Sequence, residues 1–197
     1  MAGDAVLIIL DRDGVLNRTV PSATEPRPDS PLSVEQAAIF PWVPAALRRL
    51  TAAGFGIAIA SNQPAAAKGK TSRAVLAEVH RVICTAAQRE GGIILGSHIC
   101  FHRAEDGCAC RKPRTGLLAE AFASYPQYQP GASWMVGDRA SDMQAGAAFG
   151  MKTAYLGDTA SSDFASLTAT EVRPSFCGTD LRDFVDFLLG KSPVIHG

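Results

Sequence analysis

Residues 6–17 read VLIILDRDGVLN, and this stretch decides the fold. Its first five residues are apolar without alternation, which predicts a strand buried on both faces, as the strands of parallel sheets are. Asp11 and Asp13 follow directly, and Gly14 allows the chain to turn sharply behind them. The stretch therefore predicts a buried strand that presents two carboxylates at its C-terminal end.

Short apolar runs alternate with helical patterns along the rest of the chain, which is typical of an α/β fold with a mostly parallel sheet and helices on both faces. Further strands are expected at residues 56–60, 97–101, 133–136 and 153–156. Helices are expected between Pro44 and Gly54, between Thr71 or Ser72 and Gly91, and over residues 117–122, 144–149 and 181–189. The second of these helices should bury Val75, Val79, Val82, Ile83 and Ala86.

The length of 197 residues suits one domain with a single core, and we expect one domain over residues 1–197. Residues 17–40 contain Pro21, Pro26, Pro28 and Pro31 and too few apolar residues for a core of their own. We therefore expect this proline-rich segment to be a loop near the functional site, with no separate cap domain.

The charge balance bears on the possible partners. The chain has 19 basic and 19 acidic residues, so no large electrostatic footprint favours nucleic acid or an anionic membrane. No apolar stretch approaches the roughly 20 residues that span a bilayer, and the apolar run over residues 5–10 is too short for a secretory signal. We expect a cytoplasmic, monomeric protein with a small-molecule substrate.

Polar residues stand at the ends of four predicted strands. Asp11, Ser61, Cys100 and Asp138 each lie at or just past the C-terminal end of such a strand. In an open α/β sheet this edge is where ligands bind. The sequence therefore predicts that these four positions meet at one site.

The residue types at this edge favour phosphoryl transfer. Asp11 can act as a nucleophile and Asp13 as general acid and base, provided that Mg²⁺, bound with the help of Asp138, masks the negative charge. Ser61 and Lys112 can bind the phosphate oxygens. Taken singly, the acidic turn and the serine would be better explained as a solvated turn and a helix cap. Their order along the chain, each after its own strand, favours the catalytic interpretation.

A second constellation predicts a zinc site. Cys100, His102, Cys108 and Cys110 place four soft ligands within eleven residues, and four protein ligands are typical of structural Zn²⁺. Small buried cysteines beside a surface histidine would explain one or two of these positions but not all four. A zinc loop over residues 100–110 would also fix the backbone just before Arg111 and Lys112, and so aim Lys112 into the phosphate site.

The same motifs resemble those of the haloacid-dehalogenase (HAD) phosphatase superfamily. Asp11-Arg12-Asp13-Gly14 is similar to its first motif, Ser61-Asn62-Gln63 to its second, Lys112 to its third, and the run from Gly137 to Asp142 to its fourth. The resemblance implies a Rossmann-like fold and an aspartyl-phosphate on Asp11. It also implies that Asp11, the carbonyl of Asp13 and Asp138 hold Mg²⁺, and that Asp142 holds a metal-bound water or Lys112.

The cysteine pattern, with Arg111, Lys112 and Pro113 after it, is similar to one HAD branch. This branch contains the D-glycero-D-manno-heptose 1,7-bisphosphate phosphatases and the histidinol-phosphate phosphatases, and the similarity runs from about residue 6 to residue 157. We expect a heptose bisphosphate that loses its 7-phosphate. The expected substrate contacts are Asn17, Asn62, Gln63, Lys68, Arg111 and Arg139.

Two other functions stay open at this point. The short zinc loop and residues 64–70 depart from the heptose enzymes, and Glu105 and Asp106 could bind an amine, so a histidinol-phosphate phosphatase is an alternative. A phosphosugar-binding protein without turnover is an alternative from another class. It would have no need of a nucleophile such as Asp11.

Overall fold

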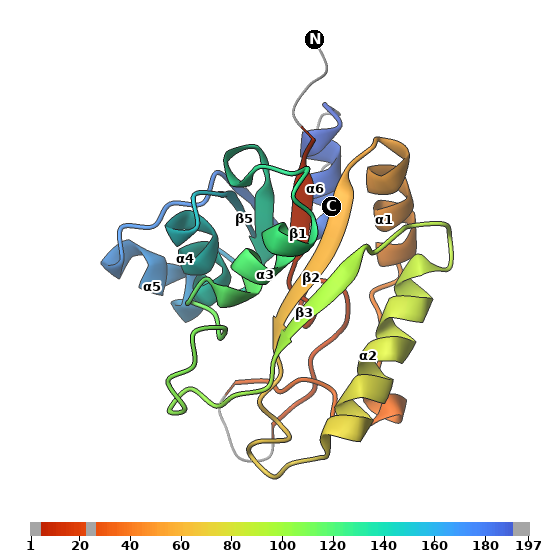
Figure 1. Ribbon diagram of the computed structural model, residues 1–197, viewed down its shortest axis with the longest axis vertical. Helices are drawn as coiled ribbons and strands as arrows, with labels where there is room; N and C mark the ends of the chain where they lie inside the picture. The colour runs from red at the N-terminus through yellow and green to blue at the C-terminus, as the bar shows by residue number, and fades with distance from the viewer. Residues whose placement is uncertain (1–4, 23–26, 191–197) are drawn as a thin grey trace.

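Six parallel strands form one sheet in the described part of the chain, residues 5–22 and 27–190, in the order β3-β2-β1-β4-β5-β6. In this computed structural model β1 lies at the centre of the sheet (Figure 1). The strands are β1 (Leu7–Leu10), β2 (Gly56–Asn62), β3 (Gly96–Cys100), β4 (Trp134–Gly137), β5 (Lys152–Leu156) and β6 (Phe176–Gly178). The predicted α/β class with a parallel sheet is confirmed.

Residues of β1 alternate between two cores, because successive side chains of a strand point to opposite faces. Ile8 and Leu10 belong to the core under three helices: α1 (Val43–Ala52), α2 (Arg73–Gln88) and α6 (Leu181–Leu188). Leu7 and Ile9 belong to the core on the other face, under α3 (Gly116–Ser124) and α4 (Ala140–Ala148). All four side chains are buried, so helices cover both faces of the sheet as expected.

Two helices begin at side chains that cap them. The Ser72 hydroxyl accepts a hydrogen bond from Val75 N at the start of α2, and the Asp180 carboxylate accepts one from Arg182 N at the start of α6. The buried face of α2 differs from the predicted one, because it contains Leu76, Val79, Ile83 and Ala87. Val75, which was expected in the core, is exposed.

The C-terminal third contains elements that the sequence did not predict. Helix α4 begins at Ala140, not at residue 144, because the Asp142 carboxylate accepts a hydrogen bond from Arg139 N and starts the helix directly after β4. Helix α5 (Ser162–Ala169) and strand β6 were both missed. So were two short 3-10 helices, η1 (Val34–Gln36) and η2 (Pro130–Ala132).

The long loops lie at the C-terminal edge of the sheet (Figure 1). The proline-rich loop, residues 17–40, is held by backbone hydrogen bonds between Val20 and Asp29, and by one from Phe40 N to Leu16 O. Residues 23–26 of this loop, and both ends of the predicted domain, lie outside the described residues. All catalytic positions predicted from the sequence fall within the described part.

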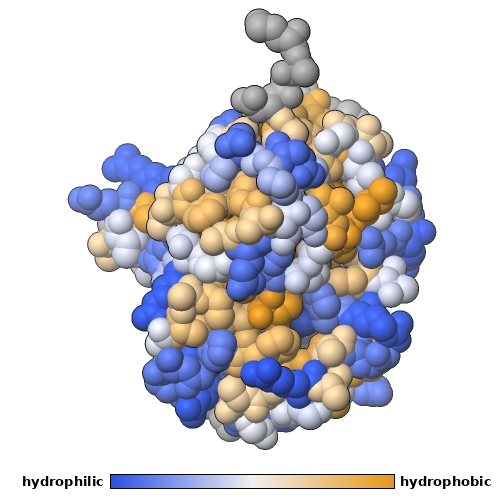
Figure 2. All heavy atoms as spheres, viewed as in Figure 1, coloured by the Kyte–Doolittle hydropathy of each residue, from blue (hydrophilic) through white to orange (hydrophobic). Residues whose placement is uncertain are grey.

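The surface view mixes hydrophilic and hydrophobic residues on this face of the molecule (Figure 2). Hydrophobic residues gather near the connection between α2 and β3, where Ile93 and Leu95 are exposed. Among the described residues, no helix has the length and apolar character needed to cross a membrane.

The packing of α6 generates a test of the fold. Phe184 is fully buried against Trp134, whereas Phe187 on the same helix is 47% exposed. Because Phe184→Ala would leave a cavity in the core, we expect it to lower the free energy of unfolding by about 3–5 kcal/mol. Phe187→Ala is the matched control and should lower it far less. Urea denaturation followed by circular dichroism measures both, and equal losses would contradict this packing.

Candidate active site

A cavity of about 390 Å³ opens at the C-terminal edge of the sheet. Eight of the residues predicted from the sequence line it: Asp11, Asp13, Ser61, Asn62, Lys68, Arg111, Lys112 and Arg139. Asn17 and Gln63 are buried and do not line the cavity. The segments that converge here are far apart in the sequence, and the parallel strands bring them together.

Three carboxylates crowd together beside this cavity. Asp11, Asp138 and Asp142 each offer an oxygen, and these atoms lie within 4.8 Å of one another. Burial raises the pKa of Asp138 well above its usual value, and the charges of Asp11 and Asp142 raise it further. Asp138 Oδ1 is buried and has no hydrogen-bond partner among the described residues. A hard cation such as Mg²⁺, which prefers carboxylate oxygens, fits this arrangement.

Lys112 brings a positive charge to the three carboxylates. Its Nζ lies 2.7 Å from Asp142 Oδ1 and 3.2 Å from Asp11 Oδ1, and it donates a hydrogen bond to Ala60 O. Burial acts to lower the pKa of Lys112, but Asp11 and Asp142 raise it overall, so the side chain stays charged. The predicted contact between Lys112 and Asp142 is therefore present.

Asn62 positions the backbone of Lys112. Its side-chain amide donates to Lys112 O at 3.0 Å and accepts from Lys112 N at 3.1 Å. Both polar groups of this side chain serve the backbone, and Asn62 also lines the cavity, where a substrate contact was expected. Asn62 links the end of β2 to the segment that follows the cysteine cluster.

Asp13 sits in a dense network of donors. Its carboxylate accepts hydrogen bonds from Arg12, Asn17, Ser30 and Gln63. Burial acts to raise the pKa of Asp13, but the Arg12 guanidinium and the three hydrogen bonds lower it overall. Asn17 and Gln63 therefore lie beneath the cavity and hold Asp13, and Gln63 also donates to Ser61 Oγ.

Arg12 is a buried part of the site that sequence reasoning missed. Only 1% of its surface is exposed, and its guanidinium contacts Asp13 Oδ2 at 3.0 Å. The sequence offered one indication of this role, because Arg12 stands between two aspartates at the end of a buried strand. A buried cation needs a charged partner, and Asp13 is the adjacent one.

Two glycines allow the carboxylates to approach the backbone so closely. Gly14 has a φ of +85°, and a Cβ added to it would lie 2.0 Å from Asp138 Oδ2. A Cβ on Gly137 would lie 2.1 Å from Asp142 Oδ2. The turn after β1 is therefore packed directly against Asp138.

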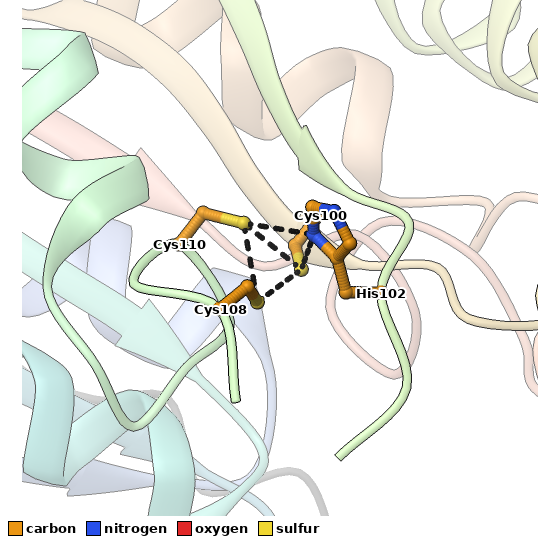
Figure 3. A group of neighbouring side chains, drawn as sticks. All are labelled: Cys100, His102, Cys108 and Cys110. Carbon is orange, nitrogen blue, oxygen red and sulfur yellow. Dashed lines mark hydrogen bonds between the residues drawn. The ribbon is translucent and has the colours of Figure 1, made fainter. Parts of the chain in front are cut away.

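The four predicted zinc ligands form one cluster (Figure 3). The Sγ atoms of Cys100 and Cys108 are 3.7 Å apart, those of Cys100 and Cys110 are 3.2 Å apart, and His102 Nδ1 lies 3.3 Å from Cys110 Sγ. Zinc–sulfur bonds of about 2.3 Å in a tetrahedron place sulfur atoms about 3.8 Å apart. The donor set and its spacing therefore fit a four-coordinate Zn²⁺.

The electrostatics of the cluster also fit a cation. Burial raises the pKa of Cys110 to about 12, and the neighbouring Cys100 and Cys108 contribute to this shift. The three thiols are free cysteines, so no disulfide relieves their crowding. Arg111 follows the cluster, lines the cavity and donates to His102 O at 3.2 Å. The cluster and the cavity are thus joined through Arg111 and Lys112.

Sequence reasoning also missed one wall of the cavity. This wall comes from the proline-rich loop and from α4 and α5, and its residues are Thr19, Arg27, Pro28, Asp29, Ser30, Ser141, Gln144, Asp163 and Ser166. Asp29 forms an ion pair with Lys70 at 2.6 Å, which joins the proline-rich loop to the segment after β2. The only indication of this wall in the sequence was that the proline-rich loop was expected to lie near the site.

Comparisons with known proteins find similarity to HAD hydrolases and to heptose bisphosphate phosphatases. Residues 109–184 match the HAD-hydrolase-like family. The D-glycero-beta-D-manno-heptose-1,7-bisphosphate 7-phosphatase of Neisseria meningitidis is 35% identical over 155 residues, which cover 76% of each chain. The D-glycero-alpha-D-manno-heptose-1,7-bisphosphate 7-phosphatase of Mycobacterium tuberculosis is 32% identical over 146 residues, 73% of this chain and 72% of the relative.

Solved structures of heptose bisphosphate phosphatases also resemble this chain. The D,D-heptose 1,7-bisphosphate phosphatase of B. bronchiseptica, complexed with magnesium and phosphate, has a TM-score of 0.79 at 29% identity. That comparison covers 95% of this chain and 99% of the other. The corresponding enzyme of Burkholderia thailandensis has a TM-score of 0.65 at 27% identity, over 94% and 99% of the two chains.

The close approach at Gly14 generates a test of the metal site. Gly14→Ala should displace Asp138 and lower the affinity for Mg²⁺ by about tenfold or more, since disturbed support of a ligand typically costs 10- to 100-fold. Gly131→Ala is the control, because its Cβ would meet nothing within 4 Å. Isothermal titration calorimetry with Mg²⁺ measures both variants. Unchanged affinity in Gly14→Ala would show that Asp138 does not hold the ion.

Proposed function

Because this chain belongs to the HAD phosphatases, which are phosphoric monoester hydrolases, we propose that it removes the 7-phosphate of D-glycero-D-manno-heptose 1,7-bisphosphate. One observation carries the mechanism: Asp11, Asp138, Asp142 and Lys112 meet beside a single cavity. The choice of substrate rests on the named relatives that share the fold. The reduced thiols of the cysteine cluster support a cytoplasmic setting.

Asp11 acts as the nucleophile in this proposal. Its Oδ1 accepts a hydrogen bond from Arg12 N at 2.7 Å and lies 3.2 Å from Lys112 Nζ, so the carboxylate is held at the floor of the cavity. Attack on phosphorus forms an aspartyl-phosphate and releases the sugar alkoxide, and water then hydrolyses the acyl phosphate. Lys112 and Ser61 bind the phosphate oxygens as charge shifts between them.

Asp13 gives a proton to the leaving sugar oxygen and later takes one from the attacking water. Arg12, Asn17, Ser30 and Gln63 all donate to its carboxylate, and they stabilise the anion that remains after proton donation. This network therefore favours the anionic form of Asp13, which is the form that takes a proton from the attacking water. Asn17 and Gln63 act here by positioning Asp13.

Two metals complete the proposal. Asp11, the carbonyl of Asp13 and Asp138 would hold Mg²⁺, which when bound neutralises the negative charges of the carboxylates and the phosphate. Cys100, His102, Cys108 and Cys110 would hold a structural Zn²⁺. The zinc loop ends at the residue before Arg111, so its metal fixes the backbone that carries Lys112.

The cavity lining supports a phosphorylated sugar over an amine. Glu105 and Asp106, which could have bound the amine of histidinol phosphate, do not line the cavity and form ion pairs with Arg103. The acidic lining residues Asp29 and Asp163 are neutralised by Lys70 and Arg27. Basic side chains from several segments face the same space, as a bisphosphate requires.

Phosphate release from a panel of substrates tests this function. We expect the wild-type enzyme to need Mg²⁺ and to prefer the heptose 1,7-bisphosphate anomers to histidinol phosphate. Asp11→Asn should abolish turnover, and Lys112→Met should lower kcat by about 10²–10³, as the loss of a well-placed donor to a transition-state charge does. Lys152→Met, on β5 and not in the cavity lining, is the control.

Two results would contradict different parts of the proposal. A strong preference for histidinol phosphate would overturn the substrate and leave the mechanism standing. Turnover by Asp11→Asn close to the wild-type rate would overturn the aspartyl-phosphate.

The zinc loop generates a separate prediction. Cys110→Ser should weaken zinc binding by about a hundredfold or more, because a thiolate ligand is lost. It should also lower kcat several-fold, because Lys112 is then less firmly placed. Cys177→Ser is the matched control, since Cys177 is exposed and lies outside the cluster. Metal content by mass spectrometry and steady-state kinetics measure both. Full activity in zinc-free protein would refute the positioning role.

A further inference from the structure

Arg27 brings a cation from the proline-rich loop into the wall of the cavity. It lines the same space as Asp11 and Ser61, although neither the motifs nor the proposed chemistry gives it a role. A sugar with phosphates at both ends needs cationic donors at two places. A basic residue of the cavity must therefore bind the phosphate that is not hydrolysed.

Asp163 holds Arg27 in place. Arg27 Nη1 lies 2.9 Å from Asp163 Oδ1, and the other oxygen of Asp163 accepts a hydrogen bond from Ala140 N at 2.6 Å. Asp163 belongs to α5, and Ala140 is the first residue of α4. The carboxylate thus ties Arg27 to the N-terminal ends of α4 and α5, and Ser141, Gln144 and Ser166 of these two helices also line the cavity.

The guanidinium keeps donors for a ligand while it is held in this way. Arginine has five N–H donors in a planar fork that fits phosphate oxygens, and the ion pair with Asp163 uses Nη1. The Arg27 side chain is 61% exposed, so this ion pair contributes little to stability. Arg27 therefore reaches the cavity wall beside Asp163 and has only a small structural role.

Three other basic residues of the cavity contact the carboxylate cluster or the zinc loop. Lys112 Nζ contacts both Asp11 and Asp142, and Arg139 Nε lies 3.7 Å from Asp138 Oδ2. Arg111 donates to His102 O in the zinc loop. Arg27 differs because its partner, Asp163, belongs to neither the carboxylate cluster nor the zinc loop.

We propose that Arg27, together with Ser141, Gln144 and Ser166, forms a subsite for the anomeric phosphate, the one that the enzyme leaves on the sugar. This inference rests on the proposed function and adds a residue that determines specificity. It gives the proline-rich loop a part in choosing bisphosphates over monophosphates.

Steady-state kinetics with two classes of substrate test the subsite. For the heptose 1,7-bisphosphate, Arg27→Ala should raise KM by about tenfold with kcat nearly unchanged, since a charged hydrogen-bond partner in binding is lost. For a substrate with one phosphate, the heptose 7-phosphate or p-nitrophenyl phosphate, it should change neither constant. Arg27→Lys should give an intermediate KM for the bisphosphate, because lysine keeps the charge and loses the fork.

Arg48→Ala is the matched control. Arg48 is 57% exposed, forms a weak ion pair with Glu90 on the surface and does not line the cavity. It should alter neither substrate, and both variants should keep the wild-type melting temperature. Equal losses on both substrate classes, or no change in Arg27→Ala, would overturn the subsite. A wild-type enzyme that releases no phosphate from the bisphosphate would instead contradict the proposed function, and the subsite with it.

Discussion

The repulsion among three crowded carboxylates, two of them buried and one half-buried, is the constraint on which this site depends. Asp11, Asp138 and Asp142 come from the ends of two neighbouring strands and the start of one helix, and the fold holds their oxygens within 4.8 Å of one another. Buried like charges are tolerated only where cations compensate them. Lys112 supplies one such charge from within the protein. The remaining negative charge fits a divalent cation, and in the proposed mechanism that cation and Lys112 would together attract the phosphate.

Support for Lys112 comes from two directions. Asn62 binds its backbone on one side, and the cysteine cluster ends two residues before it on the other. Asp13 has comparable support from Arg12, Asn17, Ser30 and Gln63. Catalytic groups that depend on exact placement are commonly held by such outer contacts. Much of the polar sequence around the motifs therefore serves to position a few reacting atoms.

Much of the fold could be predicted because its strands are buried and its motifs stand at their ends. Residues 6–17 alone indicated a buried strand with an acidic end, and β1 is that strand, at the centre of the sheet. Strand β6 was missed because it has three residues, none of them fully buried, and so gives no apolar run. The start of α4 was placed too late because its first turn is polar and is formed by Asp142, which also contacts Lys112. The support roles of Asn17 and Asn62 depend on side-chain direction, which spacing in the sequence does not encode.

The parallel sheet also divides the molecule into two rims with different tolerance for change. Every strand in the described residues runs toward the catalytic rim, so the connections from helix to strand all turn at the opposite one. The turn between α2 and β3 is one of these, and Gly91 there has nothing near the place of a Cβ. Loop length costs little entropy on the surface. That far rim is where a fused partner, an affinity tag or an evolutionary insertion can join the enzyme without entering the space around the substrate.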